Sequence, residues 1–188
     1  MRRALVIAGP LYVVVSLIEV VTRDGFDPTR HAWSVLANGE HGWIHTVTLI
    51  VSGILTVLGA AALRNRWIVV YGLGLIGAGL FRADAGRGFP PGTPETVPVS
   101  WHGTLHFVVS GIGFVALVVA CLRSRRHMLF SRITGVAFLV TFVAMAATGG
   151  AAWSLLGFTA AVILASCWLS VIATEKEKAH AVPDFAAR

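Results

Sequence analysis

Six long apolar segments, separated by short polar stretches, limit this chain to a helical protein embedded in a membrane. Of its 188 residues, 56% are hydrophobic and only 13% are charged, too few polar side chains to cover a soluble globule of this size. A helix needs about 20 mostly apolar residues to cross the hydrocarbon core. The predicted spans cover residues 4–21, 42–63, 67–81, 101–122, 129–148 and 152–173. We expect an all-α integral membrane domain over residues 1–175 and a cytoplasmic tail over residues 176–188.

The basic residues orient the predicted bundle, with both termini in the cytoplasm. In this orientation eleven of the 15 Lys and Arg residues fall on the cytoplasmic side, as the positive-inside rule requires. The net charge of +6 then reflects topology, and nucleic acid is not an expected partner because no recognised binding motif is present. The remaining four arginines are expected on the extracytoplasmic side: Arg23, Arg30, Arg82 and Arg87.

A five-residue motif occurs twice, each time at the start of a long apolar segment. The copies, HGWIH and HGTLH, occupy residues 41–45 and 102–106. The polar segments before them also resemble each other, which indicates an internal duplication. Spans one and two would then form one unit and spans three and four the other. Because both units have the same orientation, we expect a parallel repeat related by a pseudo-twofold axis along the membrane normal.

The duplicated motif predicts a metal site. Histidines spaced i, i+4 lie on one face of a helix about one turn apart, and the pseudo-twofold axis would bring both pairs together. The predicted ligands are His41, His45, His102 and His106. Imidazole suits Zn, Cu and Fe, and we expect one of these ions. Haem, held axially by two facing histidines such as His45 and His106, is the weaker candidate because it leaves the other histidine of each pair unexplained.

Polar residues continue from the motif into the spans. Tyr12, Ser16 and Glu19 share a narrow arc of the first span, and similar stripes follow the histidines on spans two and four. Polar groups at membrane depth normally face the bundle interior or a water-filled cavity. We therefore expect spans one to four to surround a polar pocket that opens outward, with spans five and six packed beside it.

Three functions are consistent with this pocket. The first is a binding protein for a transition metal. The second is a metal-dependent membrane hydrolase acting on a lipid-like substrate, with Glu19 or Asp84 as general base. The third is a module without catalysis that binds lipid headgroups or a partner through the four outer arginines. The structural alternatives are interfacial capping for the histidines and a plain ion pair with Arg23 for Glu19. A homo-oligomer is compatible with all three.

The glycine-rich sequence GLGLIG at residues 72–77 matches a dinucleotide-binding pattern, but it lies within an apolar span with no preceding strand. Small residues let membrane helices approach closely. We therefore expect it to be a helix-packing surface.

The segment GFDPTRHAWSVL, residues 25–36, resembles the signature of the small bacterial and archaeal membrane proteins catalogued as domain of unknown function 998. The most specific part is Phe-Asp-Pro-x-Arg with the later Ser-x-Leu. The resemblance implies a six-helix, multi-pass protein of a bacterial or archaeal plasma membrane, with a functional face that we expect to be extracytoplasmic, and no established activity. Within this segment, Asp27 and Pro28 favour a short helix over residues 29–37, which we expect to lie at the interface as a lid.

Overall fold

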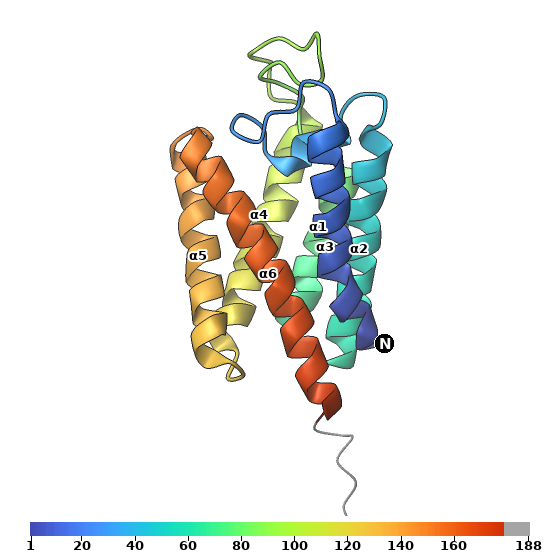
Figure 1. Cartoon of the computed structure of the whole chain (residues 1–188), viewed down its shortest axis with the longest axis vertical. Helices are drawn as coiled ribbons and strands as arrows, with labels where there is room; N and C mark the ends of the chain where they lie inside the picture. Colours follow the sequence, from blue (N-terminus) through green and yellow to red (C-terminus); the bar gives the residue numbers. More distant parts are fainter. Residues whose placement is uncertain (179–188) are drawn as a thin grey trace, which may run out of the picture.

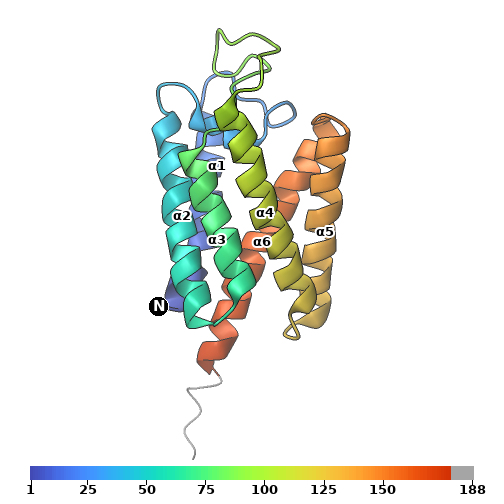
Figure 2. The same cartoon turned by 180° about the vertical axis from the view of Figure 1, so that it is seen from behind.

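The computed structural model describes residues 1–178 as a bundle of six α-helices (Figures 1 and 2). A short 3₁₀ helix, η1 (Trp33–Ala37), lies between the first two. No β-strand occurs within residues 1–178, apart from an isolated bridge between Gly86 and Phe89. The α-helices are α1 (Arg3–Thr22), α2 (Gly42–Ala62), α3 (Arg66–Leu80), α4 (Trp101–Arg123), α5 (Met128–Ala147) and α6 (Ala152–Lys178).

The helices lie where the hydropathy pattern predicts them, within one residue at every boundary except the C-terminal end of α6. That helix continues through Lys178, and the rest of the predicted tail falls outside the described residues. Five helices are long and apolar enough to cross a membrane, whereas α3 has only 15 residues. At 1.5 Å per residue α3 is about 22 Å long, shorter than the hydrocarbon core. Val14, Leu17 and Ile18 are among the large apolar side chains exposed on the outer surface of the bundle, as expected for contact with lipid.

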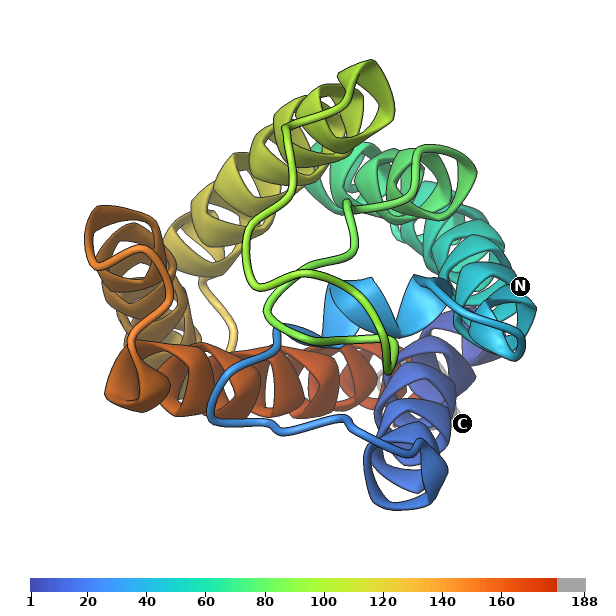
Figure 3. The same ribbon diagram turned by 90° about the horizontal axis from the view of Figure 1, so that it is seen from above.

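Seen along its axis, the bundle forms a closed ring in which the order of the helices follows the chain (Figure 3). Each helix packs against the next, and α6 returns to pack against α1. This differs from the expectation that the last two spans lie beside a four-helix core. The reason is visible at Gly9 of α1, where an added Cβ would lie 2.7 Å from the carbonyl oxygen of Ser166. The two backbones therefore meet with no side chain between them.

Glycines allow equally close contact on both sides of α3. A Cβ on Gly72 would lie 2.9 Å from the carbonyl oxygen of Gly53 in α2, and a Cβ on Gly74 would lie 2.9 Å from the Cα of Gly113 in α4. The interpretation of residues 72–77 as a packing surface is confirmed. Because α3 can approach both neighbours this closely, a short helix is held firmly between two longer ones.

A proline interrupts the hydrogen bonding of α1 without ending the helix. Pro10 has no N–H to donate to the carbonyl of Val6. The hydroxyl of Ser170 in α6 donates to that carbonyl instead, at 3.1 Å. A backbone acceptor that lipid could not hydrate is thereby satisfied by a neighbouring helix.

Two long connections, residues 23–41 and 81–100, cover the same end of the bundle, at the top of Figure 1. We call this the lid end. The 3₁₀ helix η1 buries Trp33 and Leu36 against the helices, so the expected lid is present, although its helical part begins at Trp33 rather than at residue 29. The opposite end of the bundle carries the α2–α3 and α4–α5 connections, and we call it the basic end.

Candidate functional site

A buried carboxylate and a buried imidazole meet beneath the lid. Glu19, in the last turn of α1, is 3% exposed, and His45, in the first turns of α2, is fully buried. Oε2 of Glu19 lies 2.8 Å from Nδ1 of His45. Because a carboxylate only accepts hydrogen bonds, Nδ1 carries the proton in this pair. Both residues were predicted to belong to the site, and the structure brings them into direct contact.

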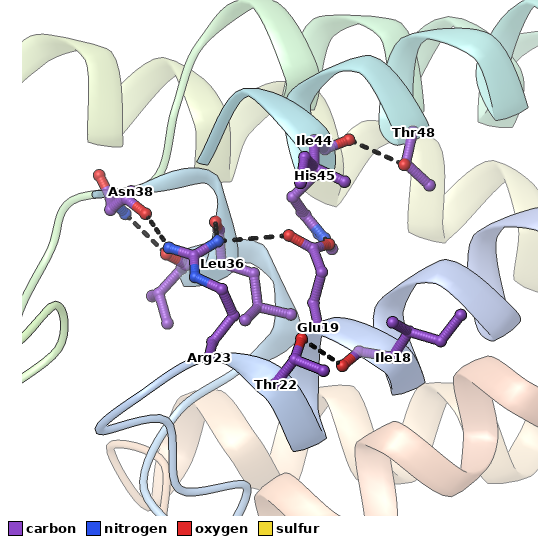
Figure 4. A network of polar contacts seen from close by, with 10 residues as sticks. Ile18, Glu19, Thr22, Arg23, Leu36, Asn38, Ile44, His45 and Thr48 are labelled. Atoms are coloured by element: carbon purple, nitrogen blue, oxygen red, sulfur yellow. Dashed lines mark hydrogen bonds and ion pairs between the residues drawn. The ribbon is translucent and has the colours of Figure 1, made fainter. Parts of the chain in front are cut away.

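Arg23 connects this pair to the lid (Figure 4). Its Nη1 lies 3.3 Å from Oε1 of Glu19 and donates to the carbonyl of Leu36 at 3.1 Å. Nη2 donates to the carbonyl of Asn38, and the guanidinium lies over the ring of Phe89, 5.4 Å from its centroid. One side chain therefore balances the charge of Glu19 and fixes the end of η1.

The second nitrogen of His45 has no partner. Nε2 is buried and has no hydrogen-bond partner within the described part of the chain. With the proton on Nδ1 directed at Glu19, Nε2 of the neutral ring presents a lone pair. Leaving a buried acceptor unsatisfied costs about 1–3 kcal/mol. This nitrogen is the most conspicuous unfilled position in the polar core.

His106 is held in a similar way on α4. It is 4% exposed, and its Nδ1 lies 2.8 Å from the carbonyl oxygen of Phe81 and 3.2 Å from that of Ala78. Carbonyl oxygens only accept, so Nδ1 again carries the proton and Nε2 of the neutral ring is left as an acceptor.

The buried histidines sit above unpaired hydroxyl groups. The Oγ atoms of Ser16, Ser52 and Ser110 are buried without a hydrogen-bond partner in the described residues. Ser52 also borders a very small cavity in the middle of the bundle, together with Tyr12 and Tyr71. The predicted polar stripes therefore do face the interior. The polar region is closed over, however, because η1 and Arg23 seal the end that was expected to be open.

The first histidine of each motif does not join the second. His41 and His102 are exposed, and His102 stacks on Trp101 with ring centroids 3.5 Å apart. His41 is the N-cap of α2 and His102 lies in the first turn of α4. The second histidine is one turn deeper and meets the helix beside it. The i, i+4 spacing places the two histidines of each motif on the same face of the helix, but at depths that differ by one turn.

Consequently, the structure does not support the predicted four-histidine cluster. Within residues 1–178 no group of three or more His, Cys, Asp or Glu side chains is arranged so that it could hold a metal ion. Of the four predicted ligands, His45 and His106 are buried.

The glycine of each motif has a packing role. A Cβ on Gly42 would collide with the backbone carbonyl of Ala37 at the end of η1, and a Cβ on Gly103 would collide with the carboxylate of Asp84. The motif therefore lets a loop residue approach the start of α2 and of α4. This packing requirement accounts for both glycines, and no bound ligand is needed to explain them.

Asp84, the second predicted catalytic acid, is used at the start of α4. Oδ2 accepts from the backbone N–H of Ser100 at 2.9 Å, and Oδ1 accepts from the Ser100 hydroxyl. That hydroxyl in turn accepts from the N–H of Gly103 at 3.0 Å. The carboxylate thus supports a helix cap at a helix N-terminus.

Three of the four arginines predicted to bind anions or headgroups contact other parts of the protein. Besides Arg23, Arg30 pairs with Glu95 at 2.7 Å, and Arg87 donates to the carbonyls of Gly149 and Gly150 in the α5–α6 turn. Arg82 is exposed, and no hydrogen bond or ion pair of Arg82 is found in the part of the chain that the structure describes. These arginines mainly join the loops of the lid end to one another.

Sequence reasoning missed His31, which lies in the family-like segment and connects both loops. It is 4% exposed. Its Nδ1 accepts from the N–H of Asp27 at 2.9 Å, so Nε2 donates to the carbonyl of Arg87 at 3.0 Å. Asp27 itself accepts from the hydroxyl and the N–H of Thr29, and these bonds hold the pKa of its carboxyl below the usual range. The Asp-Pro-Thr signal could have indicated this turn, but nothing indicated the contact with the second loop.

This fold and site define a helical, multi-pass membrane protein with a buried acid–imidazole pair beneath a two-loop lid. The chain belongs to the family described as protein of unknown function DUF998, whose model matches residues 6–175, as the segment at residues 25–36 indicated. No curated protein and no solved structure matches the chain.

Proposed function

We propose that this protein binds a single transition-metal ion, Zn, Cu or Fe, at the lid end through Nε2 of His45 and Nε2 of His106. The observation that carries the proposal is the fully buried Nε2 of His45, which has no hydrogen-bond partner. Ionisable residues at membrane depth are costly and commonly mark functional sites. The donor set is smaller than the four histidines that the sequence predicted.

The surroundings of both imidazoles support a metal ligand role. Metal-binding histidines almost always donate their other ring N–H to a carboxylate or a backbone carbonyl. His45 donates to Glu19 and His106 to Phe81. A metal ion held by two such rings would keep further coordination positions for water or for an added ligand. Arg23 and the lid would separate these positions from bulk solvent. In this proposal Glu19 orients the ligand His45 and is not itself a ligand.

The test is elemental analysis of protein purified in detergent without a polyhistidine tag. We expect about one equivalent of metal in the wild type, and loss of it in His45→Gln and in His106→Gln. The exposed residues of the same motifs supply matched controls, because His41→Gln and His102→Gln should keep the metal. A wild type that contains no metal and takes up none, or controls that lose it equally, would overturn the proposal.

Glu19→Gln tests the orienting role separately. Loss of such an outer partner typically weakens metal binding by about 10- to 100-fold. We therefore expect a weaker site that still fills at high metal concentration. Circular dichroism and thermal unfolding of each variant would show whether the bundle remains folded. Unchanged affinity in Glu19→Gln would mean that the carboxylate serves only the ion pair with Arg23.

A metal-dependent hydrolase is the second candidate, and the Glu19–His45 contact favours it. A base held by a carboxylate, with its other nitrogen free, is the arrangement used to activate a nucleophile. Neither predicted general base is free, since Glu19 and Asp84 both accept hydrogen bonds. In this alternative Nε2 of His45 would act as the base instead of binding the metal, which would be held by His106. Hydrolysis of a lipid ester or amide that disappears with chelator, while the fold persists, would distinguish this function from binding alone.

A further inference from the structure

The basic end contains a pocket that the Glu19–His45 site does not use. Its volume is about 200 Å³, and it lies between the α2–α3 connection, the end of α4 and the side of α6. Its lining residues include Arg123, Arg126 and Asn65 together with Trp67 and Trp168. It is therefore a pocket with a cationic rim and aromatic walls.

The loop that carries the rim is fixed to α6. The indole N–H of Trp168, a fully buried residue, donates to the hydroxyl of Ser131 at 2.8 Å. That hydroxyl donates to the backbone carbonyl of Arg126, also at 2.8 Å. The hydroxyl of Ser124 donates to the same carbonyl at 3.2 Å. The backbone between α4 and α5 is thus held in place before any ligand arrives.

The electrostatics of the pocket favour an anion. Two arginines, Arg123 and Arg126, are among its lining residues, and no acidic residue is. Oδ1 of Asn65 accepts from the N–H groups of Trp67 and Ile68, which leaves the amide N–H₂ of Asn65 as a donor. The start of α3 also contributes the positive end of a helix dipole. Arginine forks and a helix N-terminus together match the oxygens of a phosphate group.

The position of the pocket favours a lipid over a soluble anion. It lies at the end of helices whose outer surfaces are apolar, and Trp67 belongs to the residue type enriched at membrane interfaces. Arg66 lies over that indole ring at 5.1 Å. Basic pockets between membrane helices are known to take phospholipid headgroups. We propose that this pocket binds the phosphate headgroup of an anionic phospholipid, with the acyl chains lying along the outside of the bundle.

The experiment is native mass spectrometry of delipidated full-length protein in a neutral detergent, titrated with phosphatidylglycerol. We expect one lipid to bind, and Arg123→Gln to weaken binding at least tenfold. Arg125→Gln is the matched control, because Arg125 is exposed in the same connection but does not line the pocket; its affinity should stay within twofold of wild type.

Each other outcome overturns the proposal in a defined way. Equal weakening by Arg123→Gln and Arg125→Gln would show general attraction to positive charge. Equal binding of phosphatidylcholine would show that anionic character does not matter. Glycerol phosphate that binds as tightly as phosphatidylglycerol would make this a site for a soluble phosphate ester. Since Arg123 is exposed, its replacement should leave folding intact, and a thermal unfolding curve checks this.

Discussion

Replacing Arg23 by lysine should open the lid although the charge is kept. The guanidinium of Arg23 reaches Glu19 and the carbonyls of Leu36 and Asn38 at the same time. The lysine ammonium groups its donors at one point on a flexible stem, so it cannot reproduce the spread of donors on the planar guanidinium. We expect the ammonium to remain beside Glu19, so that both bonds to the lid are lost.

The size of the effect follows from those two bonds. A hydrogen bond to a charged group contributes about 1.5–3 kcal/mol, so two of them at the lower value give about 3 kcal/mol. Local opening of the lid should become more favourable by this amount. Because every 1.4 kcal/mol is a factor of ten, hydrogen exchange in the lid should accelerate by about a hundredfold.

The assay is amide hydrogen exchange at Val35 and Asn38. Their N–H groups donate to Ala32 and Val35 and so report on the integrity of η1. Arg82→Lys is the control, since Arg82 is exposed at the same end of the bundle. Exchange in Arg23→Lys that rises less than about threefold above this control would refute the assignment of Arg23 as the clamp of the lid.

Two further substitutions test the loops at the lid end. Gly103→Ala should destabilise the protein by about 1–3 kcal/mol, because the new methyl group collides with Asp84. Gly111→Ala on the same helix has open space and should be neutral in thermal unfolding. Equal effects of the two substitutions would rule out the contact with Asp84 as the cause. Thr29→Val should raise the pKa of Asp27 toward its ordinary value, because the Thr29 hydroxyl is the main cause of the lowered pKa. A lowered folded-state pKa stabilises the fold above the unfolded-state pKa, and this contribution disappears as pH falls through the folded-state pKa. Thr29→Val should therefore flatten the acid side of the stability curve, and an NMR titration that shows no pKa change would contradict this.

The hydropathy pattern was sufficient to place all six helices, because lipid imposes one length and one polarity on every span. The glycines of α3 could be interpreted correctly for the same local reason, since small residues in an apolar helix have few other uses. The burial of Glu19, His45 and His106 also followed from helical spacing. These are properties of single helices.

Features that depend on contacts between distant segments were not predictable. Whether a histidine near the start of a helix is buried depends on what the neighbouring helix places beside it: His45 meets Glu19 of α1, whereas His41, one turn earlier, is exposed. The use of Asp84 as a cap depends on the path of a loop that contains four of the chain's seven prolines. Likewise, the packing of α6 on α1 depends on the meeting of Gly9 and Ser166, 157 positions apart in the chain.

The circular order of the helices has a consequence for how the protein is made. During synthesis each new helix can settle on the one inserted just before it, so most interfaces form without waiting for later sequence. The exception is the contact of α6 with α1, which needs the last helix and supplies the partner for the Val6 carbonyl freed by Pro10. Until then the first helix enters lipid with one backbone oxygen unpaired. Insertion of α6 is therefore the step that closes the ring, and a chain truncated before α6 should be a ready substrate for membrane quality control.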